Sequence, residues 1–223
     1  NSAINWYNAA DPRPDYYGYL PSYYADDQAA FDLYTQYWSV PENRQINWDE
    51  LYQTNYINNY ENATQGTDKG STYILERRHS NQFNFIFNSS INHRLNSVMT
   101  LQGGANVNYT NAHYYKTIDD LLGGEFWRDI DTYAERDFPD DPTMLQNDLN
   151  NPNRKVVKGD TFGYDYNIHA IQAQAWIQNM IALPKWDIDY ALKMSYTQFY
   201  RDGQMRNGRA PENSYGKGKT HRF

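Results

Sequence analysis

The sequence predicts a mainly β protein, made of antiparallel hairpins from a large transmembrane β-barrel whose long extracellular loops carry short helices. Two observations predict this fold class. Apolar and polar side chains alternate along four segments of the 223-residue chain, and short turns alternate with long polar connections between these segments. Alternation sustained over about 9 to 11 residues is what a tilted strand needs to cross a bilayer.

The composition narrows the possible classes further. Mean hydropathy is -0.95 although only 21% of the residues are charged, so the polarity comes from uncharged side chains. The chain has 22 Tyr, 6 Trp and 9 Phe, which argues against disorder. A net charge of -7 argues against nucleic acid as a partner. The absence of cysteine excludes disulfides and thiolate metal sites.

The N-terminal part of the chain is rich in Tyr, Pro, Asp and Asn, and we expect two short helices within a long loop there. The first helix is predicted over residues 27–34 with Asp26 as its N-cap. The second is predicted over residues 48–52, with Asn47 as its N-cap and Glu50 at the capping-box spacing.

A first hairpin is predicted where side chains alternate with period two. The apolar face carries Phe83, Phe85, Phe87 and Ile91 on one strand and Met99, Leu101, Ala105, Val107 and Tyr109 on the next. The other face carries Gln82, Asn84, Asn88, Ser90, Thr100, Gln102, Asn106 and Asn108. A short polar turn at residues 93–96 joins the two strands.

A second hairpin repeats this pattern around a turn at residues 183–186. Its apolar face carries Ile171, Ala173, Ala175, Ile177, Ile188, Tyr190, Leu192, Met194 and Tyr196. Its polar face carries Gln172, Gln174, Gln178, Asp187, Asp189, Lys193, Ser195 and Thr197.

The connections between these segments set the expected organisation. Short turns of membrane barrels lie on the periplasmic side and long loops lie outside. We therefore expect a partial outer-membrane β-barrel domain over residues 1–223, with an extracellular loop region at 1–70, a hairpin at 71–110, an extracellular loop at 111–165, a hairpin at 166–201, and a loop with the start of the next strand at 202–223.

Alternation alone also fits a soluble sheet, and three features favour a membrane barrel. The alternating segments reach the length of a membrane strand. Their polar face is rich in amides, as expected for a wet or plugged lumen. Aromatic residues mark the segment ends, with Trp186 in a turn and Tyr109, Tyr196 and Tyr200 at the other ends.

Several loop motifs resemble one protein family. They are INWYNAADPRPDYY at 4–17, DDLLGG at 119–124, AERDFP at 134–139, LQNDLNNP at 145–152, GYDY at 163–166 and RNGRAPENSYGKG at 206–218. Together they resemble the barrel region of large TonB-dependent receptors from Bacteroidetes-type bacteria. The resemblance spans nearly the whole chain, although the motifs lie in loops and carry no known chemistry.

The resemblance implies an importer in the outer membrane of a Gram-negative bacterium, which binds a nutrient and carries it across that membrane. Its barrel would have roughly 22 strands and be closed by a plug domain. The implied partners are the remainder of the barrel and the plug, the TonB energy-coupling complex, outer-membrane lipid and a surface lipoprotein. Because neither a plug nor an N-terminal coupling segment is recognised, we expect this chain to be a fragment.

No catalytic motif stands out, and we expect neither an enzyme nor a cofactor. The chain has no Gly-rich phosphate loop, His-Glu metal helix or nucleophile elbow. Its five histidines, at 79, 93, 113, 169 and 221, lack ligand spacing. The acidic cluster of Asp137, Asp140 and Asp141, near Asp129 and Asp131, offers oxygen ligands to Ca²⁺, although Asp-Pro turns explain it as well.

Candidate ligand contacts are loop residues with aromatic rings or guanidinium groups. Rings can stack on a sugar or peptide, and a basic tail can pair with an anionic ligand or with acidic loops. The candidates are Tyr114, Tyr115, Trp127, Arg128, Arg206 and Arg209.

A soluble β-rich cell-surface module that binds glycan or peptide, as an adhesin does, is the alternative function. The direction of the apolar side chains separates the two hypotheses. In a module they fill a closed core, whereas in a barrel they form one outward band.

Overall fold

The computed structural model describes residues 2–61 and 70–223. The chain is mainly β, with 47% strand and 20% helix, and its sheet is antiparallel, as the sequence predicts. Within these residues the sheet stays open and does not close on itself. None of the helices described is both long enough and apolar enough to span a membrane.

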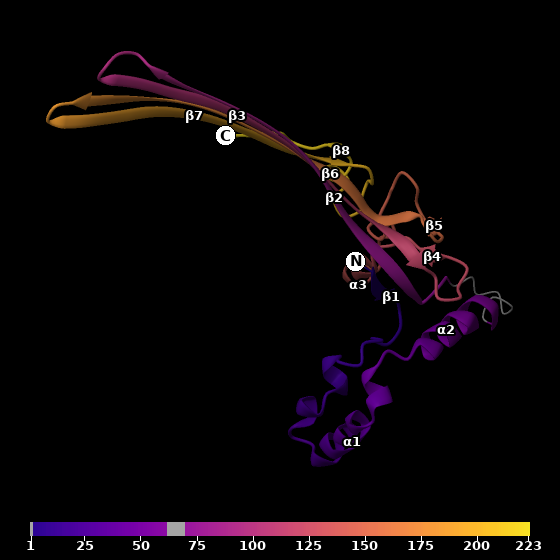
Figure 1. The fold of residues 1–223 in the computed structure, drawn as a ribbon. Helices are drawn as coiled ribbons and strands as arrows, with labels where there is room; N and C mark the ends of the chain where they lie inside the picture. The colour runs from indigo at the N-terminus through magenta and orange to yellow at the C-terminus, as the bar shows by residue number, and fades with distance from the viewer. Residues whose placement is uncertain (1, 62–69) are drawn as a thin grey trace. The chain divides into compact units, whose positions relative to one another are not determined.

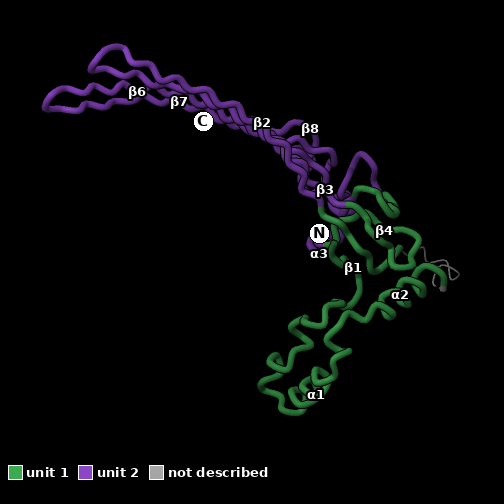
Figure 2. Tube along the Cα trace, in the orientation of Figure 1, with its two compact units in different colours: residues 1–78, 117–132, 153–161 green, residues 79–116, 133–152, 162–223 purple. Residues whose placement is uncertain are grey.

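The chain divides into two compact units (Figure 2). Unit 1 comprises residues 1–78, 117–132 and 153–161, and unit 2 comprises residues 79–116, 133–152 and 162–223.

The main sheet has seven strands in the order β1-β2-β3-β6-β7-β8, with β9 also pairing with β7 (Figure 1). Their bounds are Ser2–Trp6 for β1, Tyr73–Arg94 for β2, Met99–Asp120 for β3, Thr161–Leu183 for β6, Trp186–Gly203 for β7, Gly216–Lys217 for β8 and His221–Arg222 for β9. A separate two-stranded sheet pairs β4 (Trp127–Arg128) with β5 (Lys155–Val156).

The second hairpin follows the predicted register. Strands β6 and β7 pair antiparallel from Leu183 with Trp186 to Tyr166 with Gly203. The turn between them lies at residues 184–185, inside the predicted range. Because Ile177 stands opposite Leu192, and Gln174 opposite Ser195, the predicted apolar and polar sets occupy opposite faces of this hairpin.

The first turn lies later than predicted, between Arg94 at the end of β2 and Met99 at the start of β3. The side-chain oxygen of Asn96 accepts hydrogen bonds from the backbone N–H groups of Val98 and Met99, both at 2.9 Å. This Asx-type turn moves the reversal to residues 95–98 and lengthens β2.

The strands are also longer than the alternation indicates. Strand β3 continues to Asp120 and β6 begins at Thr161, so residues 111–120 and 161–165 of the connection expected at 111–165 belong to these two strands. Tyrosines support these extensions, because Tyr114 of β3 stacks on Tyr166 of β6 with ring centroids 5.4 Å apart.

Both predicted helices are present in unit 1, and both are longer than predicted. Helix α1 covers Gln28–Ser39 and α2 covers Trp48–Tyr56. The cap of α2 is Asn47, as predicted, whereas the cap of α1 is Asp27, so the prediction of Asp26 is wrong. Asp27 lies three residues before Ala30, whose N–H it accepts at 3.1 Å.

Shorter helical segments complete the chain. They are η1 (Tyr17–Tyr19), η2 (Pro21–Tyr24), η3 (Pro41–Arg44), η4 (Ile57–Glu61) and α3 (Thr132–Asp137).

A small core joins α2 to the sheet in unit 1. Leu51, Tyr73 and Leu122 are buried together. Beside them the fully buried side chain of Asn55 accepts hydrogen bonds from the backbone N–H groups of Thr72 (2.7 Å) and Tyr73 (3.0 Å). Its amide nitrogen lies 2.7 to 3.1 Å from three backbone carbonyl oxygens, those of Tyr73, Leu121 and Leu122.

Candidate functional site

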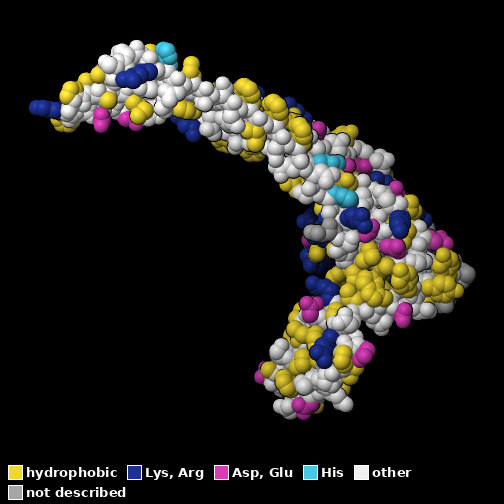
Figure 3. Space-filling model, in the orientation of Figure 1, with side chains coloured by type: hydrophobic (Ala, Val, Ile, Leu, Met, Phe, Trp, Pro, Cys, Tyr) yellow, Lys and Arg dark blue, Asp and Glu magenta, His cyan; other side chains and the backbone are white. Residues whose placement is uncertain are grey.

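An exposed apolar face in unit 2 is the first candidate feature. Phe85 is 54% exposed, Leu192 64% and Met194 71%, so these side chains do not fill a core. Figure 3 shows exposed hydrophobic side chains along this part of the chain. We define the apolar band by its large members, Phe83, Phe85, Phe87, Ile91, Ile177, Ile188, Tyr190, Leu192, Met194 and Tyr196.

Aromatic and histidine side chains lie on the same face, at the end of the band that is remote from the turns. The Tyr109 hydroxyl lies 3.0 Å from Nδ1 of His169, whose ring stacks on Tyr200 at 4.7 Å. The ring of Tyr115 stacks on His79 at 4.3 Å and on His113 at 4.4 Å. We call these six residues the aromatic row.

At the opposite end of the band, Trp186 begins β7 beside the turn and is 73% exposed. The band is therefore bounded by aromatic side chains at both ends. In the sequence the histidines are far apart. Only the register of the strands brings His79 and His113 to the same ring, that of Tyr115.

The other face of the same strands is polar. Asn84 accepts a hydrogen bond from the Thr110 hydroxyl at 2.8 Å, and Asn106 donates one to Asn88. Gln178 donates to the carboxylate of Asp189 at 2.7 to 2.8 Å. This face is the more polar of the two, as the alternation predicts, although Ile86, Trp176 and Met180 are exposed on it as well.

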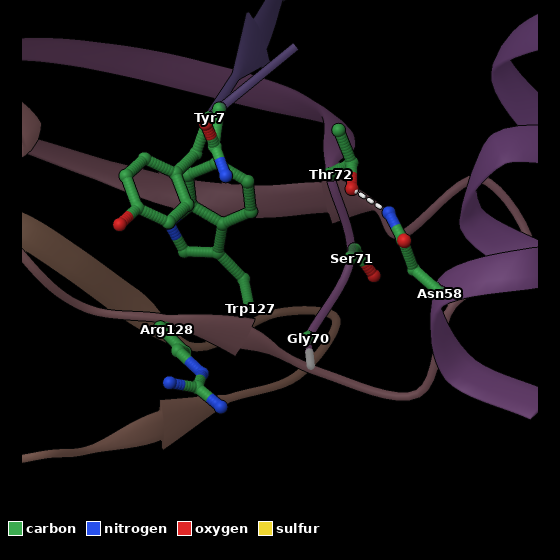
Figure 4. A pocket seen from close by; sticks show the side chains of 8 residues that line it. Tyr7, Asn58, Gly70, Ser71, Thr72, Trp127 and Arg128 are labelled. Atoms are coloured by element: carbon green, nitrogen blue, oxygen red, sulfur yellow. Dashed lines mark hydrogen bonds between the residues drawn. The ribbon is translucent and has the colours of Figure 1, made fainter. Parts of the chain in front are cut away.

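A cavity of about 240 Å³ in unit 1 is the second candidate feature. Figure 4 shows the side chains that surround it. The lining residues are Tyr7, Asn8, Asn58, Gly70, Ser71, Thr72, Trp127 and Arg128.

Three hydrogen bonds hold the walls of this cavity in place. Tyr7 continues from β1, and its N–H donates to the Thr72 carbonyl at 2.9 Å. Ser71 N–H donates to the Phe126 carbonyl at 2.7 Å, which ties the start of β2 to β4. Asn58 donates its amide to the Thr72 hydroxyl. The lining combines aromatic rings, amides and a guanidinium, groups that stack on and hydrogen-bond to a small polar ligand.

The structure distributes the six predicted contact residues over both units. Trp127 and Arg128 line the cavity of unit 1, where Trp127 is 3% exposed and pairs with Val156 of β5. The other four belong to unit 2. The sequence could not reveal Tyr7 and Asn58 as their neighbours, because hydrogen bonds between segments far apart in the chain bring them there.

The four candidate ligand contacts in unit 2 each contact nearby residues of the chain. Tyr114 stacks on Tyr166, and Tyr115 belongs to the aromatic row. Arg206 lies 3.6 Å from Glu212 and donates to the Pro211 carbonyl at 3.3 Å. The Arg209 guanidinium lies 5.9 Å from the centre of the Phe138 ring.

Carboxylates of the acidic cluster considered as a Ca²⁺ site make contacts with nearby residues instead. Asp129 pairs with Arg154 at 2.6 Å. A hydrogen bond from Arg136 lowers the pKa of Asp137, and hydrogen bonds from the hydroxyl and the N–H of Thr143 lower that of Asp141. In the described part of the chain, no group of three or more His, Cys, Asp or Glu side chains is arranged to hold a metal.

A carboxylate of β3 fixes β1 at the edge of the sheet. Asp119 accepts a hydrogen bond from the Ser2 hydroxyl at 2.8 Å and pairs with Arg77 at 2.7 Å. The Ser2 hydrogen bond and then the Arg77 guanidinium lower the pKa of Asp119, against the opposing effect of burial.

Acid should therefore loosen β1. Because the pKa of Asp119 is lower in the folded state than in the unfolded chain, its stabilisation is complete above the unfolded value of about 4 and is lost as the pH falls through the folded value. The protection of the β1 amides against hydrogen exchange, corrected for the intrinsic pH dependence of exchange, should therefore fall as Asp119 becomes protonated. In Asp119→Asn the protection of the β1 amides should depend less on pH. If it depended on pH as in the parent chain, Asp119 would not be the group that holds β1.

Comparison with known proteins finds no family model that matches the chain and no similar curated protein.

Proposed function

We propose that the chain is part of a TonB-dependent outer-membrane receptor that binds a nutrient and imports it across the outer membrane. In this proposal the two hairpins belong to the barrel wall, and the apolar band faces lipid. The remainder of the barrel with its plug, the TonB energy-coupling complex and a surface lipoprotein are the proposed partners.

The single observation that carries the proposal is the apolar band with its two aromatic boundaries. Ten large apolar and aromatic side chains of β2, β6 and β7 are exposed on one face, while the opposite face carries amides and charges together with fewer exposed large apolar side chains, among them Ile86, Trp176 and Met180. A patch of this kind in water would recruit other proteins or lipid. Aromatic side chains at both ends match the girdles that border the apolar zone of a membrane barrel.

The cavity of unit 1 supports the binding part of the proposal. It places Trp127 and Arg128, both expected to contact a ligand, in one lining with the amides of Asn8 and Asn58. In the alternative function, a soluble binding module, the apolar side chains would fill a closed core. Their exposure favours the receptor.

Nitroxide scanning tests the lipid-facing assignment directly, because the chain has no cysteine of its own. Single cysteines at 84, 85, 87 and 88 would be spin-labelled in the full chain and reconstituted in phosphatidylethanolamine and phosphatidylglycerol vesicles. Labels at 85 and 87 should collide preferentially with oxygen, which partitions into lipid. Labels at 84 and 88 should collide with a water-soluble nickel chelate.

The expected result is an alternation of accessibility with period two, because neighbouring side chains of a strand point to opposite faces. Equal accessibility at all four positions, or lipid contact at 84 and 88, would contradict the proposal.

A further inference from the structure

Two tyrosines of unit 1 lie face to face. Tyr24 of η2 and Tyr34 of α1 have ring centroids 4.6 Å apart and ring planes only 7° from parallel. Their hydroxyl oxygens are 3.4 Å apart. Because both the ring centres and the hydroxyls are close, the two phenols point the same way. The ring carbons next to the hydroxyls therefore face each other.

The surrounding structure holds this pair in place. The Tyr24 hydroxyl lies 3.0 Å from the carbonyl oxygen of Gly18, and Tyr34 sits in the second turn of a helix capped by Asp27. Trp38 donates its indole N–H to the carbonyl of Tyr19 at 2.7 Å, which ties α1 to η1.

Other tyrosine contacts nearby have a different geometry. The rings of Tyr16 and Tyr17 are inclined by 51°, those of Tyr17 and Tyr23 by 63°, and those of Tyr23 and Tyr24 by 87°. An inclined pair presents an edge to a face, which does not align the two reactive ring carbons. Tyr17 and Tyr23 are, however, more exposed than the Tyr24–Tyr34 pair.

The chain contains no cysteine and so cannot fasten this region with a disulfide. Phenol coupling offers a different covalent fastening. We propose that Tyr24 and Tyr34 form an intramolecular dityrosine cross-link when the protein meets a one-electron oxidant of phenols, such as a haem peroxidase supplied with hydrogen peroxide. This proposal is independent of the membrane function.

The reaction balances with one peroxide for each cross-link. Each phenol loses one electron and one proton, giving two tyrosyl radicals, and the peroxide accepts both electrons and both protons to become two water molecules. The radicals join through a new carbon–carbon bond between the positions next to the hydroxyls. Each of these carbons then loses its hydrogen to the phenoxyl oxygen, which restores both aromatic rings and both hydroxyls.

The protonation state of Tyr24 fits this chemistry. Its hydrogen bond with Tyr34, followed by burial, raises the pKa of Tyr24 to about 12. The residue therefore remains a neutral phenol at neutral pH, and its oxidation removes a proton together with the electron.

In the test, the full chain is treated with a haem peroxidase and limiting hydrogen peroxide. The protein is dilute enough to suppress coupling between molecules. Dityrosine fluorescence should appear in the monomer, whose mass should fall by two hydrogen atoms. Peptide mapping should find residues 24 and 34 joined. In Tyr34→Phe, which keeps the ring but cannot form a phenoxyl radical, the monomer fluorescence should be lost.

Tyr37→Phe is the matched control, because Tyr37 lies on the same helix and is exposed. It should cross-link as the parent chain does, and circular dichroism should show that both variants are folded. Coupling through the more exposed Tyr17 or Tyr23, purely intermolecular coupling, or full cross-linking in Tyr34→Phe would overturn the proposal.

Discussion

Arginine in place of Phe85 should weaken insertion of the protein into a bilayer by about 2 to 4 kcal/mol, the cost of a cation on the lipid face near the midplane. Arginine in place of Asn84 should cost little, because the neighbouring side chain points to the opposite, amide-rich face. The measurement is the urea dependence of insertion into vesicles, followed for both variants and the parent chain.

The pair of substitutions is well matched. Phe85 and Asn84 are adjacent in β2, and both are exposed in the structure. Neither substitution therefore removes core packing. A difference in insertion free energy between the two variants thus shows which face of the strand contacts lipid and which contacts water. Similar losses from both variants would contradict a lipid-facing band, and a larger loss from Asn84→Arg would reverse the faces.

The sequence predicted the fold best where the two faces of a strand contrast. Along residues 186–196 large apolar side chains alternate with small or charged ones, and along residues 83–91 only Ile86 and Ser89 interrupt the period of two. It predicted strand ends poorly. Around Tyr114 and Tyr115, aromatic side chains point to both faces, so the alternation disappears although the hydrogen-bonded strand continues to Asp120.

Helix caps show a second limit. Asp26 and Asp27 are both good N-cap residues by type, and only backbone geometry selects Asp27, which has an extended conformation (φ -127°, ψ 94°) and faces the Ala30 N–H. At the second helix Asn47 has no such competitor directly beside it, and the prediction was correct.

The candidate sites depended even more on pairing between distant segments. Residue type alone selected Trp127 and Arg128, which line the cavity. It did not select Asn58 or Thr72, which also line the cavity and are joined to each other by a side-chain hydrogen bond. The aromatic row likewise needs the register of β2, β3, β6 and β7, which no local pattern contains.

The substitution Asn55→Leu should destabilise unit 1 by about 3 to 5 kcal/mol, because it leaves several buried backbone groups without a partner at about 1 to 3 kcal/mol each. Asn55 is fully buried, accepts from the N–H groups of Thr72 and Tyr73, and directs its amide nitrogen at three carbonyl oxygens. Leucine has a similar volume but can neither donate nor accept. The free energy of unfolding in urea measures the effect, and hydrogen exchange at Thr72 and Tyr73 locates it.

Asn55→Asp separates hydrogen bonding from packing. The carboxylate still accepts from the two N–H groups, but it places negative charge where the amide N–H donor faced the carbonyl oxygens of Tyr73, Leu121 and Leu122. Asn55→Asp should therefore lose at least as much free energy of unfolding as Asn55→Leu. Gln53→Leu is the control, because Gln53 is an exposed residue of the same helix and should change stability by less than about 0.5 kcal/mol. If Asn55→Leu were as mild as Gln53→Leu, the Asn55 side chain would not be what joins α2 to the start of β2 and the end of β3.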